Sequence, residues 1–99
     1  MDAERYFEWD ANKAERNFRK HGIRFDEAVL AFDDLFAVAE QDRIESGEQR
    51  WQTIGMAGGL LLLLVAHTVR FEDDPVREVI RIISARRADR KERRRYEHG

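Results

Sequence analysis

The longest apolar run in the chain, Leu60–Ala66, constrains the fold more than any other feature. It is far too short to cross a bilayer as a helix, which needs about 20 apolar residues. Gly58-Gly59, immediately before it, is a strong signal for a tight hairpin turn. Residues 60–71 therefore predict a long strand, and because both of its faces are apolar at the start, we expect it at the centre of a sheet.

Two upstream segments carry apolar residues at helical spacing. Residues 11–21 follow a potential N-cap in Asp10 and end before Gly22, which suits a left-handed C-terminal position. In residues 25–34 the apolar positions recur at i, i+3, i+4 and i+7. Both segments predict amphipathic helices, each with one apolar stripe that needs a surface to cover.

The remaining strands are predicted from aromatic content or from a period of two, at residues 6–9, 36–40, 50–56 and 79–85. Polar turns separate them at residues 45–48 and 73–75. A last helix is predicted over Ser84–Glu97, with Ser84 as its N-cap. It has few apolar anchors, Ala88 and Tyr96, and its basic residues recur every four positions as a ridge: Arg86, Arg90 and Arg94.

Composition excludes several classes of protein for this chain. Ninety-nine residues make one domain, and a hydrophobic content of 42% favours a folded chain. The absence of cysteine excludes a disulfide framework and a thiolate zinc site, and the three histidines lack metal-ligand spacing. The N-terminus lacks the basic and apolar regions of a secretory signal. We therefore expect a cytoplasmic protein that has no membrane partner, metal or cofactor.

Charge is distributed very unevenly along the chain. Residues 77–96 contain nine of the eighteen basic residues and three acidic ones, a net charge of +6, whereas the rest carries −8. A segment polarised in this way needs an anionic partner or is kept apart from one. The leading candidate is nucleic-acid phosphate, and an acidic protein surface is the second.

Several segments of the sequence resemble the BrnT family, the ribonuclease toxins of bacterial type II toxin–antitoxin modules. The resemblance runs from Phe7 to Glu97, and its most specific segments are KHGI at 20–23 and RIISAR at 81–86 with the basic tail. Its other segments are FEWDANKAERNFRKHGIRFDEA, GEQR at 47–50, Ile54-Gly55 and HTVR at 67–70.

What the resemblance implies is an α+β fold: a RelE-like antiparallel sheet with two N-terminal helices on one face and a basic C-terminal helix. It implies one BrnT-like toxin domain over residues 1–99. It further implies an endoribonuclease that cleaves RNA without metal, inhibits growth and is neutralised by a BrnA-type antitoxin. Operator DNA would be bound only through that antitoxin.

Metal-free RNA cleavage needs a base, an acid and fixed positive charge around the phosphorane-like transition state. Arginine suits the charge role because its planar fork matches phosphate oxygens and stays protonated. We take Arg70, Arg81 and Arg86 as catalytic candidates, and His21 because it lies in a string that resembles the family. A period of two places Arg81 and Arg86 on opposite faces of the last strand, unless Arg86 escapes this rule where strand gives way to helix.

Four further residues are candidates for RNA binding: Arg50, Arg90, Lys91 and Arg94. The alternative for each arginine is an exposed side chain or one paired with a carboxylate, and His21 has an alternative role as a cation at a helix C-terminus. The alternative function is a non-catalytic module that binds nucleic acid or an acidic protein through the basic helix. Ribosome dependence, RNA sequence preference, the proton-transfer groups, the assembly state, the antitoxin-binding surface and the activity of this member all stay open.

Overall fold

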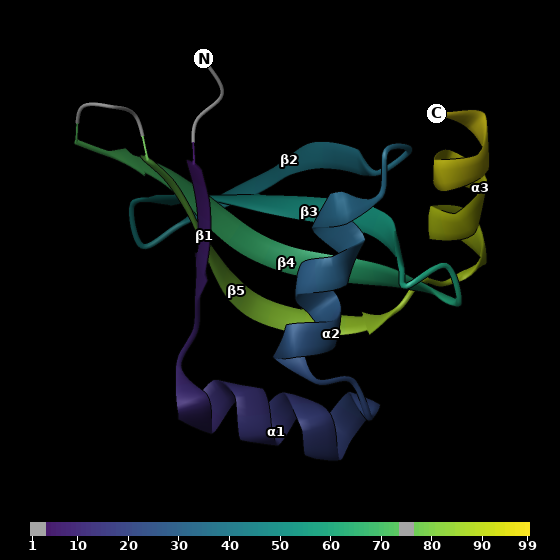
Figure 1. Ribbon diagram of the computed structural model, residues 1–99, viewed down its shortest axis with the longest axis horizontal. Coiled ribbons are helices and arrows are strands. Elements are labelled where there is room, and N and C mark those ends of the chain that lie inside the picture. Colours follow the sequence, from purple (N-terminus) through teal and green to yellow (C-terminus); the bar gives the residue numbers. More distant parts are fainter. Residues whose placement is uncertain (1–3, 74–76) are drawn as a thin grey trace.

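A computed structural model describes residues 4–73 and 77–99 as a five-stranded sheet with three helices (Figure 1). The strands lie in the order β1-β5-β4-β3-β2. In chain order the elements are β1 (Glu4–Glu8), α1 (Ala11–His21), α2 (Phe25–Leu30), a 3-10 turn η1 (Ala31–Asp33), β2 (Val38–Glu45), β3 (Glu48–Ala57), β4 (Leu61–Glu72), β5 (Arg77–Arg87) and α3 (Arg90–His98). The predicted α+β class is confirmed, although the turn predicted over residues 73–75 lies partly outside the described residues.

Strand β4 is the centre of the sheet, as its apolar run predicts. Leu63 and Val65 are fully buried on the face that α1 and α2 cover, in one cluster with Phe25 and Ala28. Leu62 and Leu64 point to the opposite face, in a smaller cluster beneath α3. The strand is apolar on both faces because helices cover both. Within residues 4–73 and 77–99, no helix has the length and apolarity to span a membrane.

The sheet is mixed, which corrects the prediction of an antiparallel sheet. Strand β1 pairs with β5 in parallel, in a register that joins Phe7 to Ile80 and Glu8 to Arg81. This pairing places Phe7 on the buried face, where its ring lies 5.2 Å from that of Phe32. A period of two defines which face a strand buries but says nothing of its direction, so the sequence carried no signal for this pairing.

The two ends of α1 form as its capping residues predict. The Asp10 carboxylate accepts a hydrogen bond from the amide of Asn12 at 3.1 Å, and Gly22 ends the helix with a φ of 72°. The helix predicted over residues 25–34 is instead α2 followed by η1. Its last turn tightens where it packs on β3: a Cβ added to Gly55 would lie 2.3 Å from the carbonyl oxygen of Ala31.

The side chain of Asn17 provides hydrogen-bond partners for the backbone of β5 where that strand extends beyond β1. It is 7% exposed, and its amide donates to the carbonyls of Ile23 at 3.1 Å and Ala85 at 2.9 Å. Its carbonyl oxygen accepts from the amide of Ala85 at 3.1 Å. The side chain thus stands in for a neighbouring strand and joins α1 to the sheet.

The helix predicted over Ser84–Glu97 begins later than expected. Strand β5 continues to Arg87, and the N-cap is Asp89, whose carboxylate accepts from the amide of Glu92 at 2.8 Å. Pairing with β4 holds the intervening residues in the strand ladder. Ala88 and Tyr96 anchor α3 on the small cluster beneath it, as predicted.

Candidate nucleic-acid interface

A one-residue bulge in β5 brings Arg81 and Arg86 to the same face of the sheet. Arg81 pairs with Thr68 and Arg86 pairs with Leu64, but the register shifts between them and leaves Ile83 as the extra residue. Thr68 and Leu64 lie four residues apart on β4 and share a face. The regular alternation that separates the two arginines in the sequence is therefore broken.

Two more predicted arginines lie on this face, opposite to α1 and α2. Arg50 lies two residues before Gln52, which pairs with Ala66, and Arg70 lies two residues after Thr68. We call the surface formed by Arg50, Arg70, Arg81 and Arg86 the arginine face.

Arg50 and Arg81 converge on one carboxylate, that of Glu48. The Nη2 of Arg50 lies 3.9 Å from Oε1 of Glu48, and the Nη1 of Arg81 lies 3.8 Å from Oε2. Both distances exceed those of a hydrogen bond. The Nε of Arg50 is buried, with no hydrogen-bond partner among the described residues. The two guanidinium groups thus define an anion position that Glu48 occupies loosely.

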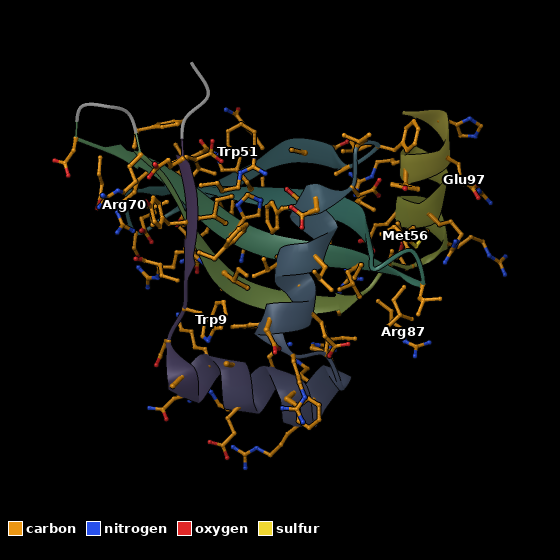
Figure 2. All side chains as sticks on the ribbon, viewed as in Figure 1. Trp9, Trp51, Met56, Arg70, Arg87 and Glu97 are labelled. Atoms are coloured by element: carbon orange, nitrogen blue, oxygen red, sulfur yellow. The ribbon has the colours of Figure 1, made fainter. Side chains whose placement is uncertain are left out.

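Arg70 is tightly paired, in contrast. It binds both carboxylate oxygens of Glu8, at 2.7 and 3.0 Å, and a carboxylate oxygen of Glu72 at 2.8 Å. The hydrogen bonds that Arg70 donates to Glu8 and then to Glu72 raise the pKa of Arg70, and the bond from Arg70 lowers the pKa of Glu8. In Figure 2 Arg70 lies at the end of the sheet far from α3. The structure therefore keeps it apart from the cations of that helix.

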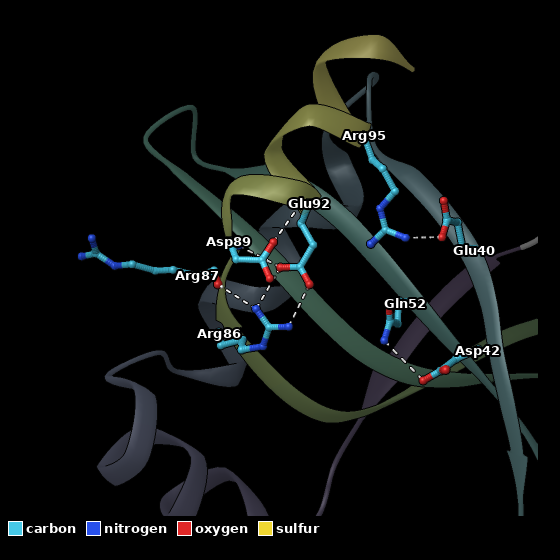
Figure 3. A network of polar contacts seen from close by, with 8 residues as sticks. All are labelled: Glu40, Asp42, Gln52, Arg86, Arg87, Asp89, Glu92 and Arg95. Atoms are coloured by element: carbon cyan, nitrogen blue, oxygen red, sulfur yellow. Dashed lines mark hydrogen bonds and ion pairs between the residues drawn. The ribbon is translucent and has the colours of Figure 1, made fainter.

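Arg86 attaches α3 to the sheet by binding Glu92 (Figure 3). Its guanidinium donates to both oxygens of Glu92, each at 2.8 Å, and Glu92 is 7% exposed. The hydrogen bonding of Arg86 to Glu92, in which the guanidinium donates, raises the pKa of Arg86. Glu92 also accepts from the amide of Asp89 at 2.8 Å, so this pair joins the end of β5 to the first turn of the helix.

The predicted ridge of Arg86, Arg90 and Arg94 does not form, because Arg86 lies on the strand. Arg90, Lys91 and Arg94 are exposed on α3, where they extend the positive charge beyond the arginine face. Arg95 turns inward and pairs with Glu40 of β2 (Figure 3).

The structure does not bring His21 to the arginines. His21 is the last residue of α1, which packs on the opposite face of the sheet. His67 also faces that side: it is 3% exposed, and its Nε2 lies 2.8 Å from the hydroxyl of Thr53. Burial lowers the pKa of His67 to about 4, so it is neutral at pH 7. Among residues 4–73 and 77–99, no group of three potential ligands is placed to hold a metal ion.

Sequence reasoning missed Glu48 as a partner of both arginines, and it missed the bulge. The doublet Ile82-Ile83 does not signal the bulge, because the similar doublet Val79-Ile80 pairs with β4 in regular register. Nothing in the sequence pattern connects Glu48 to Arg81, because they lie on strands that do not neighbour each other.

These features are those of a small α+β protein with a cationic sheet face and a basic helix at one end. The family model described as the ribonuclease toxin, BrnT, of type II toxin–antitoxin system matches residues 9–92. The chain therefore belongs to the BrnT family of ribonuclease toxins.

Comparison with solved structures agrees on the fold. The chain is similar to the 1.1 Å crystal structure of the Brucella abortus ribonuclease toxin BrnT, with a TM-score of 0.61 and 24% identity. The match covers 89% of this chain and 100% of the other. The curated proteins contain no match.

Proposed function

We propose that this protein is an endoribonuclease toxin that cleaves RNA without a metal ion and binds its substrate across the arginine face. The observation that carries the proposal is the convergence of Arg50 and Arg81 on a single, loosely held anion position. Family membership supports the same activity. Cleavage of cellular RNA in the cytoplasm inhibits growth, and a BrnA-type antitoxin neutralises the toxin and carries it to operator DNA.

In this mechanism the scissile phosphate displaces Glu48 and lies between the two guanidinium groups. The ribose 2′-hydroxyl gives its proton to water and its oxygen bonds to phosphorus, while the bond from phosphorus to the 5′-oxygen breaks and that oxygen takes a proton from water. Arg50 and Arg81 stabilise the negative charge that builds on the phosphate oxygens. Neither ion pair to Glu48 includes a hydrogen bond, so exchanging the carboxylate for a phosphate costs little. Donors of this kind each contribute about 10²–10³ in rate.

The other arginines position the substrate and the helix. Arg70, bound to Glu8, closes one end of the face, and Arg86 holds α3 through Glu92. The exposed cations of α3, Arg90, Lys91 and Arg94, contact the flanking phosphates of the RNA. His21 has no place in this mechanism because it lies on the other side of the sheet.

The test is cleavage of a defined RNA in the presence of EDTA, followed by analysis of the new ends. We expect cyclic-phosphate ends and a loss of roughly 10²–10³ in rate for Arg81→Ala and for Arg50→Ala. Arg19→Ala is the matched control, because Arg19 is exposed on α1 and pairs only weakly with Glu15 at 3.8 Å. Equal cleavage by Arg81→Ala and the control, with both variants folded by circular dichroism, would exclude the proposed phosphate site.

A non-catalytic binding module is the second candidate. The tight pairing of Arg70 with Glu8 and of Arg86 with Glu92 favours it, since two of the four arginines are already neutralised. Such a module would bind RNA with an affinity that falls steeply with salt but would leave the RNA intact. Measuring binding and cleavage on the same RNA separates the two functions.

A further inference from the structure

The chain exposes a cluster of large apolar side chains where the segment after η1 approaches α3. Leu35 is 96% exposed, Phe36 76% and Leu30 44%. Together with Met56 and Tyr96 they line a groove of about 490 Å³, within the range of roughly 300–1,000 Å³ found for binding clefts. We call it the apolar groove. Contiguous apolar surface of this kind on a small protein is typical of a binding site.

Hydrogen bonds to Asp34 hold the apolar groove in shape. The carboxylate of Asp34 accepts from the amide of Met56 at 2.8 Å, the amide of Phe36 at 2.9 Å and the hydroxyl of Tyr96 at 2.6 Å. Burial opposes the ionisation of Asp34, but these hydrogen bonds outweigh it and keep the pKa of the carboxyl below its ordinary value. Since β3, α3 and the loop before β2 meet at one charged group, the groove is preorganised, which reduces the entropic cost of binding.

The charges around the groove favour a protein segment over RNA. Asp33 and Asp34 line it, and their carboxylates repel a phosphate chain. On the neighbouring helix, Arg93 is exposed one turn before Tyr96, and Arg90 and Arg94 are exposed beside it. A segment with apolar anchors in the groove and acidic residues over α3 satisfies both parts of this surface.

We propose that the apolar groove is the docking site of the antitoxin, which inserts an apolar segment whose flanking acidic residues lie along α3. The inference rests on the antitoxin partnership proposed above, and the family is described as belonging to toxin–antitoxin systems. A segment bound in this way covers the cations of α3 and removes them from the RNA path, while the anion position between Arg50 and Arg81 is left uncovered. Neutralisation thus acts on substrate binding.

The experiment uses the purified protein encoded by the reading frame next to the toxin gene, titrated into the full toxin by calorimetry. Leu35→Asp and Phe36→Asp place a charge among the anchors, and we expect each to weaken binding by about 30-fold or more while RNA cleavage is unchanged. Ile44→Asp is the matched control, because Ile44 is 69% exposed but lies near the other end of β2. Arg93→Glu should also weaken binding, and by less at high salt.

Binding of Leu35→Asp and Phe36→Asp at the affinity of the control would overturn the docking site, whatever the outcome of the cleavage assay. So would light scattering that shows a wild-type dimer and a Leu35→Asp monomer with unchanged antitoxin affinity, since the groove would then join two copies of the toxin. Conversely, loss of antitoxin binding at the groove in a protein that does not cleave RNA would support the docking site and refute the ribonuclease proposal.

Discussion

Removing the side chain of Asn17 tests how much its hydrogen bonds to β5 and to Ile23 stabilise the fold. Asn17→Ala deletes three hydrogen bonds, two to Ala85 and one to the carbonyl of Ile23. Ala85 is fully buried, so its amide and carbonyl lose their partners in a place that water reaches poorly. At about 1 kcal/mol for each bond, we expect the free energy of unfolding to fall by about 3 kcal/mol.

Urea unfolding followed by circular dichroism measures this loss. For a domain of this size, about 3 kcal/mol corresponds to a melting temperature lower by about 12–24 °C. Asn12→Ala is the matched control, because the Asn12 side chain is exposed on the same helix and only its backbone amide binds Asp10. A loss for Asn17→Ala within about 0.5 kcal/mol of this surface control would refute the role assigned to the side chain.

Asn17→Asp extends the test to pH. This substitution replaces a donor with a carboxyl that faces the carbonyls of Ile23 and Ala85, so its folded pKa should rise above the unfolded value of about 3.9. A raised folded pKa means that the variant keeps its stability at acid pH and loses it as pH rises. The difference in unfolding free energy from wild type should therefore be larger at pH 7 than at pH 4, and a difference independent of pH would contradict this account.

Three further perturbations address packing, titration and anion binding. Gly55→Ala places a Cβ 2.3 Å from the carbonyl oxygen of Ala31, so the backbone must move. We expect thermal denaturation to show that the free energy of unfolding falls by about 1–3 kcal/mol. An unchanged melting temperature would contradict the close packing of β3 on η1. His67 protonates near pH 6.5 in the unfolded chain but near pH 4 in the folded protein, so the stability that the neutral side chain contributes is lost as pH falls through this window. Relative to His67→Gln, the wild type should lose about 2 kcal/mol of unfolding free energy between pH 7 and 4.5. Parallel pH profiles of the two proteins would contradict the lowered pKa of His67. Glu48→Gln removes the carboxylate that competes with RNA for Arg50 and Arg81, so filter binding at fixed salt should show an RNA affinity raised by roughly tenfold. Glu15→Gln, at an exposed position on α1, is the control. Weaker RNA binding by Glu48→Gln would contradict the anion position between the two arginines.

The parts of the fold that the sequence predicts are those that local chemistry determines. Helix α1 has the predicted bounds because a capping carboxylate and a left-handed glycine act within a few residues of its ends. The hairpin at Gly58-Gly59 forms because both residues have positive φ, 60° and 75°. The early end of α2 and the parallel pairing of β1 depend on contacts with segments distant in sequence, and local patterns do not report them.

The same division applies to the arginine face. Residue type and charge selected Arg50, Arg70, Arg81 and Arg86, which the structure places on one surface. Charge counting could not show which of them are neutralised, because their carboxylate partners come from other elements. Glu8 lies on β1 and Glu92 in α3, and only the folded chain brings them to Arg70 and Arg86.

One extra residue in β5 explains how a cationic face and a docked helix arise from the same strand. Without the bulge at Ile83, the register would pair Arg86 with Leu63, and its guanidinium would point to the face of the sheet opposite to α3 and Glu92. With the bulge, Arg86 emerges beside α3 and binds Glu92, while Ala85 takes the buried position under Asn17. The bulge therefore brings Arg86 to Glu92 and so attaches the helix that carries the chain's densest positive charge.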